Sequence, residues 1–337
     1  MSKREYEKYI AAPIRSDRKP LHELLPLDQP LRVLIDPSDV CNFRCNFCFQ
    51  SQQDFKGSVM SLDTFRIIVE QIKEFERPIN VVHLYGLGEP LVNKNIAIFV
   101  KELKENKVAK EVAITSNGSL LTHELSEKLV MAGLDRLSIS LNGITDEHFK
   151  KNVNANVDFK KLYEEINYFY KIRNKTHLHV KINGECFTEE EKDKFVKMFV
   201  DCTDSINIDH VVNVWSGLQL ADNNGQRMYD FETEELNKDE DSRKKVCPLM
   251  FYEVLIHPDG NVSPCAVDYT YKKQNLGSIF DNSIKKIWNN EILKKIRIQE
   301  LLGSKNDYCI CNTCKYSDCA ATVSITSYRD TLVKKYR

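Results

Sequence analysis

The sequence has no surplus of charge of either sign and no long apolar stretch. It holds 48 Lys plus Arg against 49 Asp plus Glu, so the formal net charge is −1. This balance gives no support to nucleic acid or an anionic membrane as a partner. There is no run of about 18 apolar residues, so no transmembrane helix is expected. Met1–Tyr6 are mixed in charge and no apolar run follows them, which argues against a secretory signal and predicts a cytoplasmic protein.

Cysteine is the residue that the sequence holds in unusual number. The 337 residues include 11 cysteines, although structural disulfides are rare in the cytoplasm. Cys41, Cys45 and Cys48 form one group, whereas Cys186 and Cys202 stand alone and are interpreted as small buried apolar residues. Clustered cysteines at short spacing predict metal or iron–sulfur ligands in such a protein. The second group, in the last third of the chain, consists of Cys247, Cys265, Cys309, Cys311, Cys314 and Cys319.

Short β-like runs alternate with longer helical stretches between residues 31 and 217. In one helical stretch, Leu62–Phe75, apolar residues recur at three- and four-residue spacing. Six strands that alternate with helices predict an α/β fold of parallel βαβ units, and the number fits a partial (β/α)6 TIM-type barrel better than a closed eight-fold one. The predicted strands are Leu31–Asp36, Asn80–Tyr85, Glu111–Ser116, Arg136–Leu141, His177–Asn183 and Ile206–Val212.

A second, smaller unit is predicted after a polar and acidic segment. In this unit a Pro-Asp-Gly turn separates Tyr252–Ile256 from Val262-Ser263, which indicates a β-hairpin. A helix is predicted from Ser283 to about Leu302. The expected divisions are an N-terminal extension (1–30), the partial barrel (31–217), a linker (218–245), the cysteine-rich unit (246–325) and a tail (326–337).

The first cysteine group has the spacing Cys-x3-Cys-x2-Cys and follows the first predicted strand. Three thiolates on a [4Fe–4S] cluster leave one iron without a protein ligand, and an open metal position is a mark of catalysis. The carboxyl ends of the strands are also where α/β barrels place their active sites. The alternative is a zinc knuckle, or three thiols that bind no metal.

Asp39–Phe49 resembles the cysteine motif of the radical S-adenosylmethionine (SAM) superfamily. In that family the open iron chelates the amine and carboxylate of SAM, and an electron from the cluster releases methionine and a 5′-deoxyadenosyl radical. Phe47 matches the aromatic position that packs near the adenine. Gly88-Glu89-Pro90 matches the turn that holds the methionyl amine, although Leu87 stands where the family usually has glycine. A buried ammonium needs a carboxylate and backbone carbonyls, and glycine lets the backbone come close.

Two further segments resemble the strand ends that line the ribose and carboxylate of SAM in this family. Thr115–Gly118 ends the third predicted strand, and Ser138–Gly143 ends the fourth. Without the resemblance, both are βα turns rich in turn-forming residues. The SAM-binding residues that the resemblance implies are Phe47, Gly88, Glu89, Pro90, Ser116, Asn117, Ser140 and Asn142.

The C-terminal cysteines resemble the SPASM and Twitch extensions of radical SAM proteins, which hold auxiliary iron–sulfur clusters. Full SPASM domains carry seven or more cysteines and two clusters, whereas this segment has six, so one auxiliary [4Fe–4S] cluster fits better. A structural zinc ribbon is the alternative, because four thiolates in two pairs also satisfy tetrahedral zinc. The expected ligands are Cys247, Cys265, Cys311 and Cys314, with Cys309 and Cys319 as alternatives.

The core motifs do not name the substrate, and two reactions compete. In the first, the radical takes hydrogen from a small molecule or sugar and the auxiliary cluster accepts the remaining electron. The net change is a two-electron oxidation, which resembles the reaction of the Twitch-type alcohol dehydrogenases. In the second, a peptide or protein side chain is modified, as in the sulfatase maturases. Two observations favour the first reaction. Peptide-modifying members often carry an extra peptide-binding module before the barrel, and the roughly 30 residues before the first strand are too few for one. In addition, Ala266 stands where the maturases have Asp. A non-catalytic iron–sulfur electron carrier is a third possibility.

Oxidation of an alcohol also requires a base for the hydroxyl proton. The expected partners are a small-molecule or carbohydrate substrate and an electron donor such as flavodoxin or ferredoxin, with neither nucleic acid nor membrane. The candidate bases are Asp268, His257 and Tyr269, and the candidates for the barrel mouth are Glu185, Asn213 and Trp215.

Overall fold

The computed structural model describes residues 19–51, 56–209, 245–267, 275–304 and 324–337, together with Cys311, Cys314 and Tyr316. Within these residues, one curved, open sheet has eight strands in the order β6-β5-β4-β3-β2-β1-β7-β8. Neighbouring strands from β6 to β7 are parallel, and β8 runs antiparallel to β7. The strands are β1 (Arg32–Ile35), β2 (Ile79–Leu84), β3 (Ala109–Ser116), β4 (Arg136–Leu141), β5 (His177–Asn183), β6 (Ser205–Asp209), β7 (Glu253–Ile256) and β8 (Val262–Ser263).

The partial barrel predicted from the sequence is confirmed. The predicted bounds of β4 and β5 agree with the structure, and those of β1, β2 and β3 differ by one or two residues. The predicted sixth strand begins one residue inside β6 and continues into residues outside the described ranges. The linker of residues 218–245 lies almost entirely outside them as well.

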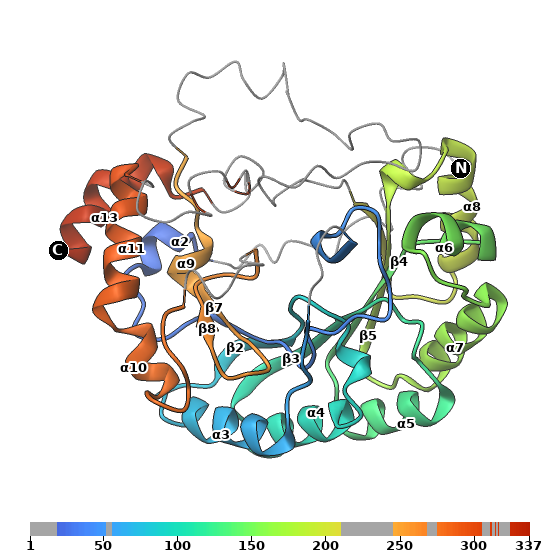
Figure 1. The fold of residues 1–337 in the computed structure, drawn as a ribbon, viewed down its shortest axis with the longest axis horizontal. Helices are drawn as coiled ribbons and strands as arrows, with labels where there is room; N and C mark the ends of the chain where they lie inside the picture. The colour runs from blue at the N-terminus through green and yellow to red at the C-terminus, as the bar shows by residue number, and fades with distance from the viewer. Residues whose placement is uncertain are drawn as a thin grey trace.

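Helices cover the convex side of the sheet (Figure 1). Several of them begin at a side chain that accepts a backbone hydrogen bond, as Ser61 does from Thr64 N at 3.0 Å. The rings of Phe65 and Phe99 stack at 3.8 Å between the first two long helices. The helices are α2 (Leu21–Leu24), α3 (Leu62–Ile72), α4 (Ile96–Glu105), α5 (His123–Met131), α6 (Asp146–Val153), α7 (Phe159–Ile172), α8 (Glu189–Phe199), α9 (Leu249–Tyr252), α10 (Ile284–Trp288), α11 (Glu291–Leu302) and α13 (Arg329–Tyr336), with 3-10 turns η1 (Phe49–Ser51), η2 (Pro90–Val92), η3 (Gly184–Cys186) and η7 (Thr326–Tyr328).

The predicted hairpin forms, and it extends the barrel sheet. His257 N–H donates to Asn261 O at 2.9 Å, and Gly260 adopts φ +82°, which its lack of a Cβ permits. The β7 strand pairs in parallel with β1, so Arg32 lies beside Glu253 although they are 221 residues apart. The hairpin therefore adds two strands to the edge of the sheet that begins with β1.

The single helix predicted from Ser283 to Leu302 is wrong, because the chain forms α10 and α11 there. The Asn290 side chain accepts a hydrogen bond from Leu293 N at 2.7 Å. Such a cap begins a new helix, and α10 ends at Trp288 before it.

The two faces of the sheet differ in chemistry, because alternate residues of each strand point to opposite sides. The face toward the helices is aliphatic and buried, and the concave face is largely polar. Among the described helices, none has both the length and the apolar character needed to cross a bilayer. The buried aliphatic residues of the convex face include Val33, Ile35, Val82, Leu84, Val112, Ile114, Leu137, Ile139, Leu178, Val180, Ile182 and Ile206.

Candidate active site

The first cysteine group lies in the loop after β1, at the carboxyl edge of the sheet. Cys41, Cys45 and Cys48 are half-buried and form no disulfide. Burial raises the pKa of Cys41 to about 11. Burial, together with the charges of the other two thiols, raises the pKa of Cys45. The three thiols therefore lie close enough to influence one another, and a metal that bound them would release their protons.

The donor set of this loop fits an iron–sulfur cluster. Three thiols can supply three thiolates, and Asn142 at the end of β4 donates a hydrogen bond to Cys45 Sγ at 3.6 Å. In the part of the chain that the structure describes, no three His, Cys, Asp or Glu side chains converge as ligands of a single metal ion. Thiolates on a four-iron cluster bind different irons, so they need not converge on one point.

Glu89 follows β2 and is almost fully buried, with 2% of its surface exposed. Its carboxylate accepts hydrogen bonds from Ser116 Oγ and Asn117 N, both at 2.7 Å, and from Leu91 N at 2.9 Å. Burial raises the pKa of Glu89, and these donors lower it. The structure thus brings together three of the residues that the resemblance assigned to SAM.

The turn of residues 86–89 lies directly against the start of the cysteine loop. A Cβ at Gly88 would collide with the backbone of Ser38, so glycine allows this close approach. Leu87 departs from the family pattern, yet its N–H donates to Asp36 Oδ2 at 2.8 Å. The departure therefore leaves the backbone of the turn bonded to the end of β1.

The other predicted SAM residues lie around the same edge of the sheet. Asn117 Nδ2 donates to Asn42 Oδ1 in the cysteine loop at 2.9 Å. Pro90 begins η2 directly after Glu89. Phe47 and Ser140 are half-buried, in the cysteine loop and on β4 respectively.

Two residues that the sequence motifs do not include belong to this site. Asp36 is fully buried, and burial raises its pKa to about 7. Gln50 is 3% exposed, and its Nε2 donates to Asp39 O and to Leu87 O, both at 2.9 Å. In the sequence, Asp36 stands out only as a polar residue directly after an apolar strand. Gln50 stands out only as a polar residue two positions after the third cysteine.

Four C-terminal cysteines come together near β7. Cys247 precedes α9, Cys265 follows β8, and Cys311 and Cys314 come after α11. Burial raises the pKa of Cys247 and of Cys265, and the charges of Cys311 and Cys314 raise both further. These are the four thiols that the sequence analysis favours as auxiliary cluster ligands. The alternatives, Cys309 and Cys319, lie outside the described residues.

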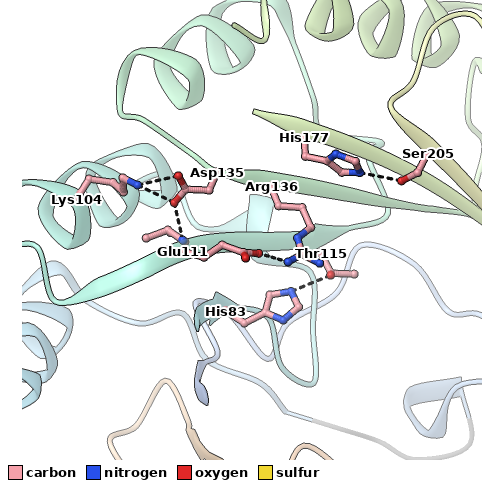
Figure 2. Close-up of polar contacts among 9 residues, drawn as sticks. His83, Lys104, Glu111, Thr115, Asp135, Arg136, His177 and Ser205 are labelled. Atoms are coloured by element: carbon pink, nitrogen blue, oxygen red, sulfur yellow. Dashed lines mark hydrogen bonds and ion pairs between the residues drawn. The ribbon is translucent and has the colours of Figure 1, made fainter. Parts of the chain in front are cut away.

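Ion pairs join neighbouring strands across the concave face. In the described part of this face, each Arg or Lys of these pairs lies beside a carboxylate of opposite charge. The paired groups therefore carry little net charge. Figure 2 shows one of them, between β3 and β4. The pairs are Arg32–Glu253 between β1 and β7, Glu111–Arg136 between β3 and β4, and Lys181–Asp209 between β5 and β6.

Imidazoles and hydroxyls lie between these ion pairs. His83 Nε2 lies 2.9 Å from Thr115 Oγ1, and His177 Nε2 lies 2.8 Å from Ser205 Oγ (Figure 2). His179 Nδ1 contacts the same Ser205 hydroxyl at 2.8 Å. Burial lowers the pKa of His83 to about 3 and that of His179 to about 4. These imidazoles are therefore neutral near pH 7 and can donate or accept hydrogen bonds.

Of the three candidate bases, His257 is the one within the described residues. It is fully buried, and its Nε2 lies 2.8 Å from Ser263 Oγ. Burial lowers its pKa to about 4, so the imidazole is neutral and enclosed by the hairpin. Asp268 and Tyr269 lie outside the described residues, as do Asn213 and Trp215, whereas Glu185 is half-buried in η3.

Comparison with known proteins gives two family matches and several relatives. Residues 35–198 match the radical SAM superfamily, and residues 247–315 match the SPASM iron–sulfur cluster-binding domain. A probable GTP 3′,8-cyclase of Saccharolobus islandicus is 36% identical over 126 residues, which cover 37% of this chain and 38% of that protein. The match thus spans less than half the length of this curated relative.

Solved structures with the same fold include proteins bound to different molecules. BtrN in complex with AdoMet and 2-DOIA has a TM-score of 0.54 and 18% identity, over 84% of this chain and 92% of BtrN. Streptococcus suis SuiB bound to the precursor peptide SuiA has a TM-score of 0.63 and 17% identity, over 86% of this chain and 73% of SuiB. The chain therefore joins a radical SAM domain, which implies a SAM-binding [4Fe–4S] cluster, to a C-terminal SPASM iron–sulfur cluster-binding domain.

Proposed function

We propose that this enzyme carries out a two-electron oxidation of a neutral, hydroxylated small molecule or sugar. The observation that supports it is the chemistry of the concave face. Its described cations are paired with carboxylates, and its histidines are neutral and bonded to hydroxyls. Neutral donors and acceptors of this kind suit hydroxyl groups better than they suit a highly charged ligand.

The proposed oxidation removes one hydrogen atom, one proton and one electron from the alcohol. When bound, SAM and its cluster supply a 5′-deoxyadenosyl radical, which takes the hydrogen atom from the hydroxyl-bearing carbon. The proton passes from the hydroxyl to a base of the chain. Cys247, Cys265, Cys311 and Cys314 would hold the auxiliary cluster that receives the electron, which leaves a carbonyl product. An external donor such as flavodoxin or ferredoxin supplies the electron that begins each cycle.

The base of the proposed reaction needs access to the substrate. The buried position of His257 speaks against it. Asp268 and Tyr269 stay candidates. Asp209 is a further one, because it ends β6 and its side chain is 36% exposed.

The named relatives suggest two other substrates. GTP carries a triphosphate, which proteins usually bind with unpaired Arg and Lys or with metal ions. The described cations of the concave face already have carboxylate partners, so this face favours a neutral substrate over GTP. A peptide is the second candidate, because SuiB, which has the same fold, is bound to a precursor peptide.

The test is to measure which molecules stimulate SAM cleavage. The anaerobic, reduced enzyme would be incubated with SAM and one of three additions: a neutral small-molecule fraction of a cell extract, a peptide fraction, or GTP. We expect the neutral fraction to raise 5′-deoxyadenosine above the substrate-free level, with one carbonyl product for each 5′-deoxyadenosine. Stimulation by GTP or by peptides alone would contradict the proposal. Absence of cleavage with every addition would favour the electron carrier.

A further inference from the structure

We infer that Gln50 is a positioning residue that fixes the turn of residues 86–89 against the cysteine loop and thereby sets where SAM binds. The inference rests on the SAM-binding role predicted for Glu89. It is independent of the substrate proposed above, because it concerns SAM alone.

Gln50 connects two segments through one amide group. It follows the third cysteine in η1, and its side chain points into the protein, where 3% of it is exposed. The two hydrogens of Nε2 go to Asp39 O, at the start of the cysteine loop, and to Leu87 O, in the turn. Both distances are 2.9 Å, which is ideal for an N–H···O bond. The amide therefore uses its full donor capacity to join the loop to the turn.

Gln50 also contacts a predicted cluster ligand through its backbone. Its N–H donates toward the Cys48 thiol. One residue thus touches the third cysteine, the start of the cysteine loop and the turn that carries Glu89. No spacing motif includes it.

The contacts around this amide make the junction compact. Glu89 N–H donates to Val40 O at 3.0 Å. A Cβ at Gly88 would collide with Ser38, so the turn packs closely against the loop. The Gln50 hydrogen bonds hold the two segments in this close contact.

This junction matters because SAM is expected to meet both of its sides. As the resemblance implies, the cysteine loop would hold the cluster to which SAM binds, and Glu89 on the turn would hold the amine of SAM. A small displacement between loop and turn would let SAM satisfy one side and not the other. We therefore expect Gln50 to act on SAM affinity and geometry, and not on assembly of the cluster.

Two substitutions test the inference in the reconstituted full chain. Gln50→Leu removes both donors at similar size, and Gln50→Glu keeps the shape but places a carboxylate against two carbonyls. For each variant we would measure iron and sulfide content, the Kd of SAM, and the change that SAM causes in the EPR spectrum of the reduced cluster. We expect wild-type iron content, about tenfold weaker SAM binding from the loss of two hydrogen bonds, and an incomplete spectral change at saturating SAM.

Gln29→Leu is the matched control. Gln29 is also buried, at 7% exposed, and its Nε2 donates to Arg77 O at 2.9 Å, away from the cysteine loop. We expect SAM binding and the EPR change to be unaltered in this variant. Three results would overturn the inference: SAM affinity within twofold of wild type in both Gln50 variants, loss of iron together with SAM binding, or equal loss of SAM binding in Gln29→Leu.

Discussion

Glu89 is a buried carboxylate that holds its place through hydrogen bonds from its own chain. The donors are Ser116, Asn117 and Leu91, at 2.7 to 2.9 Å. A carboxylate fixed in this way can meet the SAM ammonium without a further change in conformation. The predicted binding of the SAM ammonium therefore depends on the negative charge of this one side chain.

Glu89→Gln should therefore weaken SAM binding while leaving the cluster in place. A hydrogen bond to a charged group contributes about 1.5–3 kcal/mol, so we expect a loss of about tenfold or more in SAM affinity. Isothermal titration of the reconstituted protein with SAM measures it, alongside the iron content. Glu102→Gln is the control, because Glu102 on α4 pairs with Arg66 on α3, and SAM binding should not change in that variant. Equal SAM affinity in Glu89→Gln and wild type would remove Glu89 from the site.

Asp36 should make the stability of the protein depend on pH. Burial raises its pKa from 3.8 to about 7, so the folded state holds this proton more tightly than the unfolded state. The free energy of unfolding should then fall as pH rises from about 4 to about 7, by up to ~4 kcal/mol, and level off above that. Asp36→Asn lacks this contribution. Anaerobic urea unfolding at several pH values compares the two, and parallel curves would show that Asp36 does not titrate in this range.

The sequence predicted the residues that belong to short motifs and missed those that act across the fold. Cys45 and Glu89 stand at recognisable spacings. Gln50 and Asp36 are linked to the site by hydrogen bonds with Leu87, which lies 37 residues from Gln50 and 51 residues from Asp36. Such contacts depend on how the strands pair, which local sequence does not specify.

At the scale of elements, the strands were the most predictable part, because each βα unit repeats the same local pattern. The exception is β7. Its residues predicted a hairpin, but its pairing with β1 joins chain segments about 220 residues apart. The division of the helix at Asn290 was missed because apolar residues recur on both sides of the cap.

The four cysteines near β7 should bind one cluster as a unit. Cys311→Ser with Cys314→Ser should remove about four irons, leave SAM cleavage intact and abolish the oxidised product. Cys202→Ser is the control, since Cys202 is buried beside α8 and donates toward Met198 O and Phe199 O. Iron analysis and product analysis on the same samples test this. Retention of all iron in the double variant would exclude these two residues as ligands.

At the scale of the whole molecule, the sheet separates two environments. Its convex face packs aliphatic side chains against helices, and its concave face carries ion pairs and neutral imidazoles. Alternation of apolar and polar residues is visible along single strands, such as Arg136–Leu141. The order of the strands decides which charged side chains become neighbours. The near-neutral character of the concave face could therefore not be predicted from the sequence.

We expect one chain to hold a SAM-cleaving cluster and an auxiliary cluster that can accept an electron. The most direct measurement is iron and zinc content together with 5′-deoxyadenosine release, for anaerobically purified protein given SAM and dithionite. We predict about eight irons per chain and release of 5′-deoxyadenosine, with loss of about four irons and of all cleavage when Cys41, Cys45 and Cys48 are changed to Ala. About four irons and one zinc in the wild type, with cleavage intact, would contradict the electron-accepting cluster, and a fully loaded protein that never cleaves SAM would contradict the whole account.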